Sequence, residues 1–321
     1  MTRSGWPAWL LVVVTAVAPI SWGTTYLVTS EWLPADRPLW SATLRALPAG
    51  LLVLAITRRL PKGHWWWRAA VLGVLNIGAF FALLFVAAYR LPGGVAATLS
   101  AVSPLAVLVL AKLALREQPT RWRVGWGMAG VVGVALMVLG PGARLDAWGV
   151  AAGVAGVLAM SAGLVLTRRW GNPVGALPFA GWQVTAGGLF LTPLALLIEG
   201  PPPMMTPSAV AGYLWLGLVG TLLAYTVWFR AVGLLPVTAV AFLTLLSPVV
   251  ATLLGWLVLG QSLTLVQGVG FSLTLVAVIA SQWRPGPWTM RRSRQPKLAR
   301  ACARRPSTGR ACRGAWSARL R

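Results

Sequence analysis

Arg45 has the clearest capacity for chemistry in this sequence, because it is the only charged residue well inside a long apolar segment. A charge in such a segment is energetically costly, so it usually faces a cavity or a partner. A guanidinium that faces a cavity favours a ligand with a carboxylate or phosphate, which it can hold with two hydrogen bonds. Alternatively, the long side chain reaches the segment's outer interface, about two helical turns away. The sequence leaves both alternatives open.

A second signal is a module that occurs twice. Each copy has a proline, a Ser-Pro pair whose proline follows twelve residues later, and an apolar run that ends in an acidic or amide residue. The matching pairs, each 144 residues apart, are Pro92 and Pro236, Ser103 and Ser247, Pro104 and Pro248, and Glu117 and Gln261. Repetition at a constant offset indicates a duplicated unit.

The Ser-Pro pair of each copy lies inside an apolar segment of membrane-spanning length. Proline removes a backbone donor and bends or breaks a helix there, so Pro104 and Pro248 are predicted helix kinks. Kinks at matching places in two halves indicate a binding site near the middle of the membrane. The alternative is that the prolines only shape helix packing, while Ser103 and Ser247 each bond a carbonyl of their own helix.

Other polar and aromatic residues at mid-segment depth are candidates for the same pocket, which needs a few such groups on apolar walls. The candidate substrate-binding residues are Trp22, Thr25, Tyr26, Arg45, Asn76, Ser103, Gln183, Tyr225, Trp228 and Ser247. Each is equally well explained as a contact between helices, worth about 0.6 kcal/mol. Glu117 and Gln261, at the ends of their segments, are either gate residues or solvated interfacial groups.

Acidic residues, histidine and cysteine are scarce: the chain has five Asp and Glu, one His and two Cys. No acid lies deep in an apolar segment, so a carboxylate proton relay has no obvious carrier. A membrane-embedded transferase would need clustered His, Asp or Glu. We therefore expect no catalytic residue, metal site or cofactor.

Composition identifies the elements that position these residues. The 321-residue chain is 57% hydrophobic and 10% charged, with a mean hydropathy of +0.74, which predicts a polytopic membrane protein. The net charge of +23 comes from basic clusters between apolar runs and from one terminal tail. This distribution is typical of membrane topology, so we expect no nucleic-acid partner.

Ten apolar segments have about the length that crosses a bilayer. They cover residues 9–28, 39–56, 69–89, 94–115, 124–139, 146–166, 177–198, 209–232, 237–259 and 265–282. The predicted fold class is an all-α polytopic membrane protein with ten transmembrane helices. The duplication divides it into residues 1–141 and 142–283, followed by a basic tail, residues 284–321. Because each half has five spans, the halves are predicted to be inverted repeats.

Small residues form stripes in the fifth and sixth segments. They are Gly125, Ala129 and Gly133 in the fifth, and Gly149, Gly153, Gly156 and Gly163 in the sixth. Such stripes allow helices to approach closely, so we expect them to serve packing rather than chemistry.

Loop charges predict the orientation. With the amino terminus inside, the cytoplasmic loops hold twelve Lys and Arg against three outside, without the tail. This bias predicts a multi-pass protein of the cell membrane with both termini cytoplasmic. The tail has no acidic residue and no apolar period, which is typical of disorder. It is either a functionless extension or a polybasic segment that binds anionic lipid at about 1 kcal/mol per charge.

These features together resemble the ten-helix EamA-type branch of the drug/metabolite transporter superfamily. The resemblance covers about residues 8–283 and rests on Trp22-Gly23-Thr24-Thr25-Tyr26, Arg45 and the paired modules. It implies two five-helix repeats around a central cavity, and export or exchange of small metabolites. Gln261 departs from the resemblance, because the family often has Glu there.

The predicted function is secondary transport of small polar metabolites such as amino acids, by rocking of one repeat against the other. Without a buried carboxylate, a facilitator or exchanger is expected rather than a proton-coupled pump. The alternative is an exporter of drugs or lipid-linked substrates. The expected partners are the substrate and the lipid bilayer.

Overall fold

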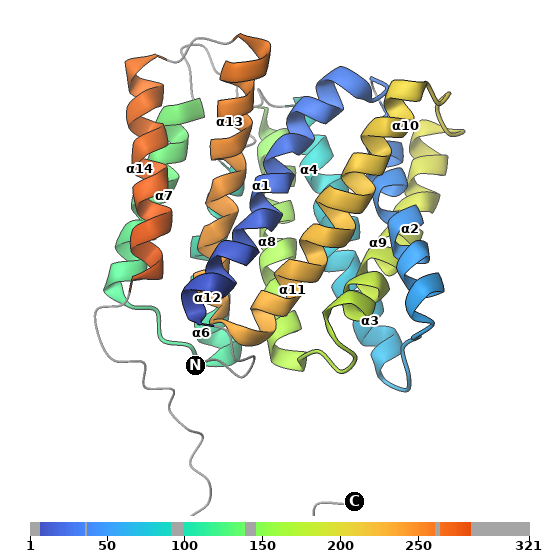
Figure 1. The fold of residues 1–321 in the computed structure, drawn as a ribbon, viewed down its shortest axis with the longest axis horizontal. Helices are drawn as coiled ribbons and strands as arrows, with labels where there is room; N and C mark the ends of the chain where they lie inside the picture. The colour runs from blue at the N-terminus through green and yellow to red at the C-terminus, as the bar shows by residue number, and fades with distance from the viewer. Residues whose placement is uncertain (1–6, 36, 91–98, 139–145, 261–263, 284–321) are drawn as a thin grey trace, which may run out of the picture. The chain divides into compact units, whose positions relative to one another are not determined.

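The computed structural model describes residues 7–35, 37–90, 99–138, 146–260 and 264–283 (Figure 1). In these ranges the chain is helical and contains no strand. The first half comprises α1 (Ala8–Trp32), α2 (Pro38–Thr57), α3 (Trp65–Gly73), η1 (Val74–Gly78), α4 (Ala79–Arg90), α6 (Ser103–Leu115) and α7 (Arg121–Val138). The second comprises α8 (Ala147–Trp170), α9 (Ala176–Glu199), α10 (Pro207–Leu214), η2 (Trp215–Leu223), α11 (Ala224–Leu234), α12 (Val237–Phe242), η3 (Leu243–Leu245), α13 (Leu246–Leu259) and α14 (Leu265–Gln282).

Eight helices of the described ranges are long and apolar enough to cross a membrane. Three of them are continuous through a change of helix type: α3–η1–α4, α10–η2–α11 and α12–η3–α13. The shorter apolar helix α6 and the 18-residue α7 complete the ten helices expected from the sequence. The predicted fold class is confirmed. The tail, residues 284–321, lies outside the described ranges, so its role stays a prediction.

Two spans contain a π-helical stretch, and the two stretches match. η1 lies in the third helix of the first half and η2 in the third helix of the second half. The repeat offset places the residues of η1 on residues 218–222, inside η2. π-helical turns are rare and occur frequently at functional sites. No proline or other sequence signal predicted this distortion.

The helices that carry the Ser-Pro pairs change conformation just before the proline. In the second half the 3₁₀ turn η3 separates α12 from α13, and in the first half a turn precedes α6. Proline has no N–H for the carbonyl four residues earlier, and its ring clashes with that carbonyl. The carbonyls of Ser100 and Thr244 therefore cannot receive the usual α-helical bond from Pro104 and Pro248.

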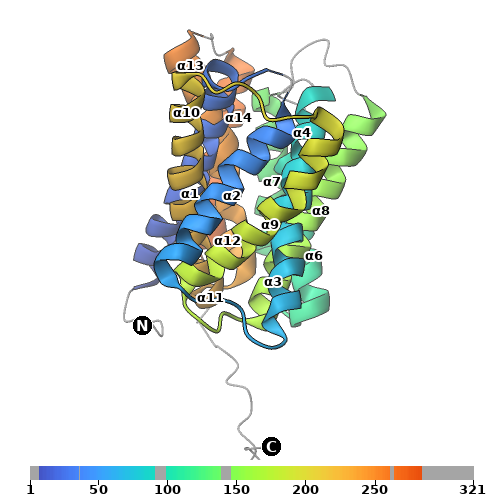
Figure 2. The ribbon, with the colours of Figure 1, turned by 90° about the vertical axis from the view of Figure 1, so that its right-hand side faces the viewer.

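The contacts between helices of the two halves are symmetric. When each helix is replaced by its counterpart in the other half, every one of the following contacts is again a contact. α2 lies against α9 and α7 against α14, so the second and fifth helix of each half meet their counterparts. α1 contacts α13 and α11, as its counterpart α8 contacts α6 and α4. Figure 1 shows α7 and α14 at one edge of the bundle, and Figure 2 looks onto α2 and α9 at the opposite edge. Two inverted repeats produce this pattern.

Glycines allow α2 and α9 to approach closely. A Cβ on Gly188 would lie 2.8 Å from the backbone N and Cα of Leu47. A Cβ on Gly50 would lie 2.6 Å from the backbone N of Thr185. Since real Cβ atoms do not come this close to backbone, both positions require glycine for the observed packing.

The small-residue stripes of the fifth and sixth helices are only partly in such contacts. A Cβ on Gly133 would lie 2.6 Å from Oγ1 of Thr274, and one on Gly163 would lie 2.7 Å from Cγ of Asn76. A Cβ on Gly125 would meet nothing within 4 Å. The expected packing role is therefore wrong for Gly125, because the side of α7 on which it lies faces away from the neighbouring helices.

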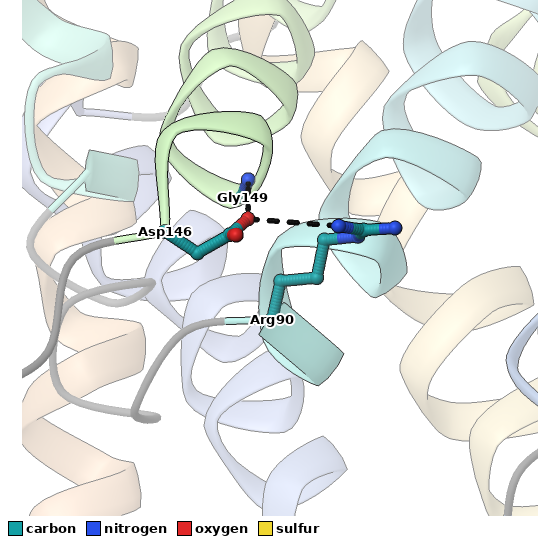
Figure 3. A network of polar contacts seen from close by, with 3 residues as sticks. All are labelled: Arg90, Asp146 and Gly149. Carbon is teal, nitrogen blue, oxygen red and sulfur yellow. Dashed lines mark hydrogen bonds and ion pairs between the residues drawn. The ribbon is translucent and has the colours of Figure 1, made fainter.

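Asp146 connects the start of α8 to the end of α4 (Figure 3). Its Oδ1 accepts a hydrogen bond of 2.7 Å from the backbone N–H of Gly149 and lies 3.8 Å from Nη1 of Arg90. The first contact is a helix N-cap, worth about 1 kcal/mol. The ion pair joins two exposed side chains and contributes less, about 0–1 kcal/mol. Capping is therefore the larger effect of Asp146.

Glu199, the last residue of α9, caps α2 from outside that helix. Its two carboxylate oxygens accept from the backbone N–H groups of Leu39 at 2.6 Å and Trp40 at 3.0 Å. The indole N–H of Trp40 donates to the carbonyl of Gly200 at 2.9 Å. The first N–H groups of a helix have no acceptor within it, and a negative charge there also complements the helix dipole.

Replacing Glu199 by alanine is expected to lower the free energy of unfolding by about 1–3 kcal/mol, because two partly buried N–H groups lose their acceptor. Thermal melting of the purified protein in detergent measures the change. Glu31→Ala is the matched control, since Glu31 is exposed at the end of α1. A Glu199→Ala protein with the same melting temperature as the wild type would contradict the capping role.

Candidate functional site

A cavity of about 430 Å³ lies between the two halves. This volume is within the usual range for small-molecule sites. The first half lines it with α1, α2, α4 and α6, and the second half with α8, α11, η3 and α13. It extends from Trp22 and Tyr225, in mid-helix, to Leu33 and Pro34, where α1 ends. The cavity therefore reaches from the centre of the bundle toward one of its ends.

The cavity brings together seven of the predicted site residues: Trp22, Thr25, Arg45, Ser103, Tyr225, Ser247 and Pro248. Asn76, Pro104, Gln183 and Trp228 are not among its described lining residues. The side chain of Tyr26 lies outside the described part of the structure. Substrate binding by any of these residues stays a prediction.

Arg45 lines the cavity and is 4% exposed, so its guanidinium does not extend to the interface. Its Nε donates to Oγ1 of Thr221 and its Nη2 to the carbonyl of Gly220, each at 3.2 Å. Its Cζ lies 4.5 Å from the ring centroid of Phe81, a cation–π contact. Both hydrogen-bond acceptors belong to η2, so the π-helical stretch holds the guanidinium in place.

Each π-helical stretch offers a carbonyl to a side chain of the other half. The carbonyl of Gly220 also accepts from the indole N–H of Trp22 at 3.0 Å. Asn76 is the repeat counterpart of Gly220, and its carbonyl accepts from the hydroxyl of Tyr225 at 3.5 Å. The matching distortions therefore fix two aromatic side chains of the cavity wall.

Thr25 and Thr29 place two hydroxyls on one face of α1, four residues apart. Both Oγ1 atoms are buried and have no hydrogen-bond partner among the described residues, although both residues line the cavity. An unpaired buried hydroxyl is unfavourable by about 1–3 kcal/mol. The described residues therefore leave the hydrogen-bonding capacity of two hydroxyls beside the cavity unused.

Tyr225 also connects the cavity to a buried polar cluster. In that cluster, Nδ2 of Asn76 donates to Oε1 of Gln183 at 2.7 Å and to Oγ1 of Thr167 at 3.2 Å. Asn76 is 3% exposed and Gln183 is fully buried. These contacts join η1, α8 and α9, which matches the interhelical alternative that the sequence left open for Asn76 and Gln183.

Aromatic rings close the inner end of the cavity. The ring centroid of Trp22 lies 5.2 Å from that of Tyr225 and 5.0 Å from that of Trp228. Tyr225 contacts Phe229 at 5.5 Å, and Phe229 contacts Phe179 at 5.8 Å. Apart from Trp22, these side chains are almost completely buried. This aromatic column, as we call these five residues, separates the cavity from the end of the bundle where α11 ends.

Glu117 lies after the end of α6 and is not among the described lining residues of the cavity. Its Oε2 accepts from Oγ1 of Thr238 at 3.4 Å, and Oγ1 of Thr238 accepts from Nη1 of Arg123 at 2.6 Å. This chain of contacts links the ends of α6, α12 and α7. Gln261 lies outside the described residues, so the predicted gate role of the pair stays a prediction.

Among the lining residues that were not identified from the sequence, three have a signal in the repeat. Ser100 and Thr244 are counterparts at the 144-residue offset, and both line the cavity four residues before the Ser-Pro proline. Phe81, which contacts Arg45, is the counterpart of Tyr225. Comparing the two halves position by position would have found all three.

The fold and the site define the class of protein. Two inverted five-helix repeats enclose a central cavity. This is the architecture of a membrane transporter. The chain belongs to the EamA-like transporter family, whose model matches residues 8–139 and again residues 147–281. The resemblance to the EamA-type branch of the drug/metabolite transporters is thus confirmed.

Several relatives are similar over most of the chain. Protein PecM of Dickeya dadantii is 44% identical over 267 residues, which is 83% of this chain and 90% of PecM. A WAT1-related chloroplastic protein of Arabidopsis thaliana is 28% identical, over 80% of this chain and 66% of its own. The uncharacterized inner membrane transporter YedA of Escherichia coli K12 is 28% identical, over 81% and 86%. A crystal structure with 19% identity matches 85% of this chain and 96% of its own with a TM-score of 0.72, which shows the shared fold.

Proposed function

We propose that the protein is a secondary transporter that moves small polar metabolites across the cell membrane by alternating access. The observation that carries this proposal is the cavity itself, which both halves line with polar groups. Arg45 and Thr25 come from the first half, and Thr244 and Ser247 come from the second. A site shared by two inverted repeats can be exposed to either side when one repeat rocks against the other.

The proposal places both termini in the cytoplasm, in line with the loop charges. The basic residues Arg58, Arg59 and Lys62 between α2 and α3 are then cytoplasmic. The cavity end at Leu33 and Pro34 is then external, and the aromatic column is the cytoplasmic barrier. In this orientation the structure corresponds to an outward-facing state.

The paired helix contacts support the rocking motion. The contacts of α1 with α13 and α11 have counterparts in those of α8 with α6 and α4. If each repeat adopted the packing that the other repeat now has, the cavity would open toward the other side of the membrane. The chain has no acidic residue deep in a span, so the proposal is a facilitator or exchanger rather than a proton-driven pump. Strong uphill uptake driven by a pH gradient would contradict that part of it.

Filling the cavity tests the proposal. Val157 lines the cavity on α8, whereas its neighbour Leu158 is 50% exposed on the outer surface. We expect wild-type protein in liposomes to take up at least one of a panel of labelled amino acids, nucleosides, sugars and carboxylic acids. Val157→Trp should abolish that uptake, because the indole occupies the cavity, and Leu158→Trp should retain it. Equal uptake by the two variants, or no uptake by the wild type beyond empty liposomes, would refute the proposal.

A further inference from the structure

We infer that the substrate is a monoanion with one carboxylate and an apolar or aromatic body, rather than a zwitterion or a cation. This inference rests on the proposed function and assigns the substrate class of the same cavity. It follows from three observations: the charge of the cavity, the free edge of one guanidinium, and the chemistry of the remaining wall.

The described wall of the cavity contains one charged side chain, that of Arg45. The four described acidic residues are engaged or placed elsewhere. Glu199 caps α2, Asp146 caps α8, Glu117 contacts Thr238, and Glu31 is exposed at the end of α1. Asp36, in the loop after α1, lies outside the described residues. Arg45 therefore has no carboxylate partner in the described structure.

A single positive charge in a membrane-embedded cavity is most favourably balanced by a single negative charge from the ligand. A cation would add a second positive charge to a site that already holds one. A zwitterion would gain the contact between its carboxylate and Arg45, but its ammonium would find no carboxylate in the described wall. The charge of the cavity therefore favours a monoanion over both.

The hydrogen bonds of Arg45 leave one edge of its guanidinium available. Nε and Nη2 bond Thr221 and Gly220 along one edge, and Phe81 lies against the guanidinium. Among the described residues, none accepts a hydrogen bond from Nη1, and Nη2 donates one of its two hydrogens to Gly220, so the Nη1–Nη2 edge can still present one N–H from each nitrogen. Two parallel N–H groups along one edge match the two oxygens of a carboxylate. The contacts from η2 hold that edge in a fixed orientation before the ligand arrives, which lowers the entropic cost of binding.

The remaining wall indicates the rest of the ligand. Phe80, Leu84, Val157 and Met160 supply apolar and aromatic surface, which suits an apolar body. The wall also carries neutral hydroxyl side chains, such as those of Thr25 and Ser247, which suit a neutral polar group on the ligand rather than a second charge.

A series of phenyl compounds that differ only in the polar group tests this inference on the purified, full-length protein. The probes are 3-phenylpropionate, L-phenylalanine, 3-phenylpropylamine and 3-phenylpropionamide, and the readout is the melting temperature as a function of probe concentration at neutral pH. We expect 3-phenylpropionate to bind at least about tenfold more tightly than the other three. Tighter binding of phenylalanine or the amine, equal binding of all four, or no effect of 3-phenylpropionate at millimolar concentration would overturn the inference.

Two variants connect the preference to Arg45. Arg45→Gln should remove the preference for the carboxylate, and Arg45→Lys should retain part of it, because the charge remains but the paired N–H edge is lost. Lys112→Gln also removes one positive charge, but from an exposed position on α6, so it should bind as the wild type does. A carboxylate preference that survives in Arg45→Gln would overturn the assignment. If that variant does not fold, Arg45→Lys and the wild-type series still decide.

The two proposals fail in distinguishable ways. Uptake that is blocked by Val157→Trp, together with a preference for the amine or the zwitterion, would refute the substrate class and leave the transport proposal standing. Binding of 3-phenylpropionate without any uptake would refute the transport proposal and leave the anion site standing.

Discussion

Replacing Arg45 by alanine is expected to abolish transport while the protein still folds and inserts. A charged hydrogen-bonding partner removed from a buried site reduces binding by about 2–5 kcal/mol, which is about 30-fold or more. Stability should not fall in parallel. The carbonyl of Gly220 retains the hydrogen bond from Trp22, and the variant no longer buries a charge without a carboxylate partner.

Two measurements on the same preparation check this prediction: initial uptake rate in liposomes and melting temperature in detergent. We expect a large loss in the first and an unchanged or higher value in the second. Lys112→Ala, which removes an exposed charge, should change neither. Undiminished uptake by Arg45→Ala would remove Arg45 from the site, and a collapsed melting temperature would show that its role is structural.

Replacing Gly188 by alanine is expected to destabilise the protein strongly, although the change adds a single methyl group. The new Cβ would lie 2.8 Å from the backbone of Leu47, so α2 and α9 would have to move apart. Overpacking of this kind lowers the free energy of unfolding by about 1–3 kcal/mol. The two helices connect the halves of the bundle, so their separation would affect both repeats.

Gly268→Ala is the matched control for this prediction. Gly268 lies in α14, and a Cβ there would meet nothing within 4 Å. Alanine in an open helical position is expected to stabilise the helix by up to about 1 kcal/mol. The two Gly→Ala changes should therefore shift the melting temperature in opposite directions. If the melting temperature of Gly188→Ala is equal to or above that of Gly268→Ala, α2 and α9 do not pack as closely as the structure shows.

Several residues of the cavity wall could be predicted from the sequence, for reasons that are local. Arg45 stands out because a charge inside an apolar segment has few acceptable surroundings. Ser103 and Ser247 stand out because proline disrupts a helix wherever it occurs within one. All three residues line the cavity in the structure. These predictions depend on segment length and residue type, which can be read from the sequence without knowing which residues are close in space.

Other features could not be predicted because they depend on contacts between distant residues. Trp228 is an aromatic residue in the middle of a span, as Trp22 is. Its ring packs against that of Trp22, but it is not among the described lining residues of the cavity. Gly125 belongs to the same small-residue pattern as Gly133, but only Gly133 meets a neighbouring helix. The direction in which each side chain points follows from helix rotation, and the sequence pattern of an apolar helix does not fix that rotation.

By itself, the sequence determined that this protein is a duplicated, ten-helix membrane protein with one arginine inside a span, because the bilayer imposes segment length and apolar composition on every span. Only the tertiary structure decided which polar residues meet in the cavity and where the π-helical stretches lie. It also decided that glycines allow α2 and α9 to pack closely. In a bilayer nearly every face of an apolar helix is tolerated by lipid. The choice of face is therefore made by packing between helices, which involves residues more than a hundred positions apart.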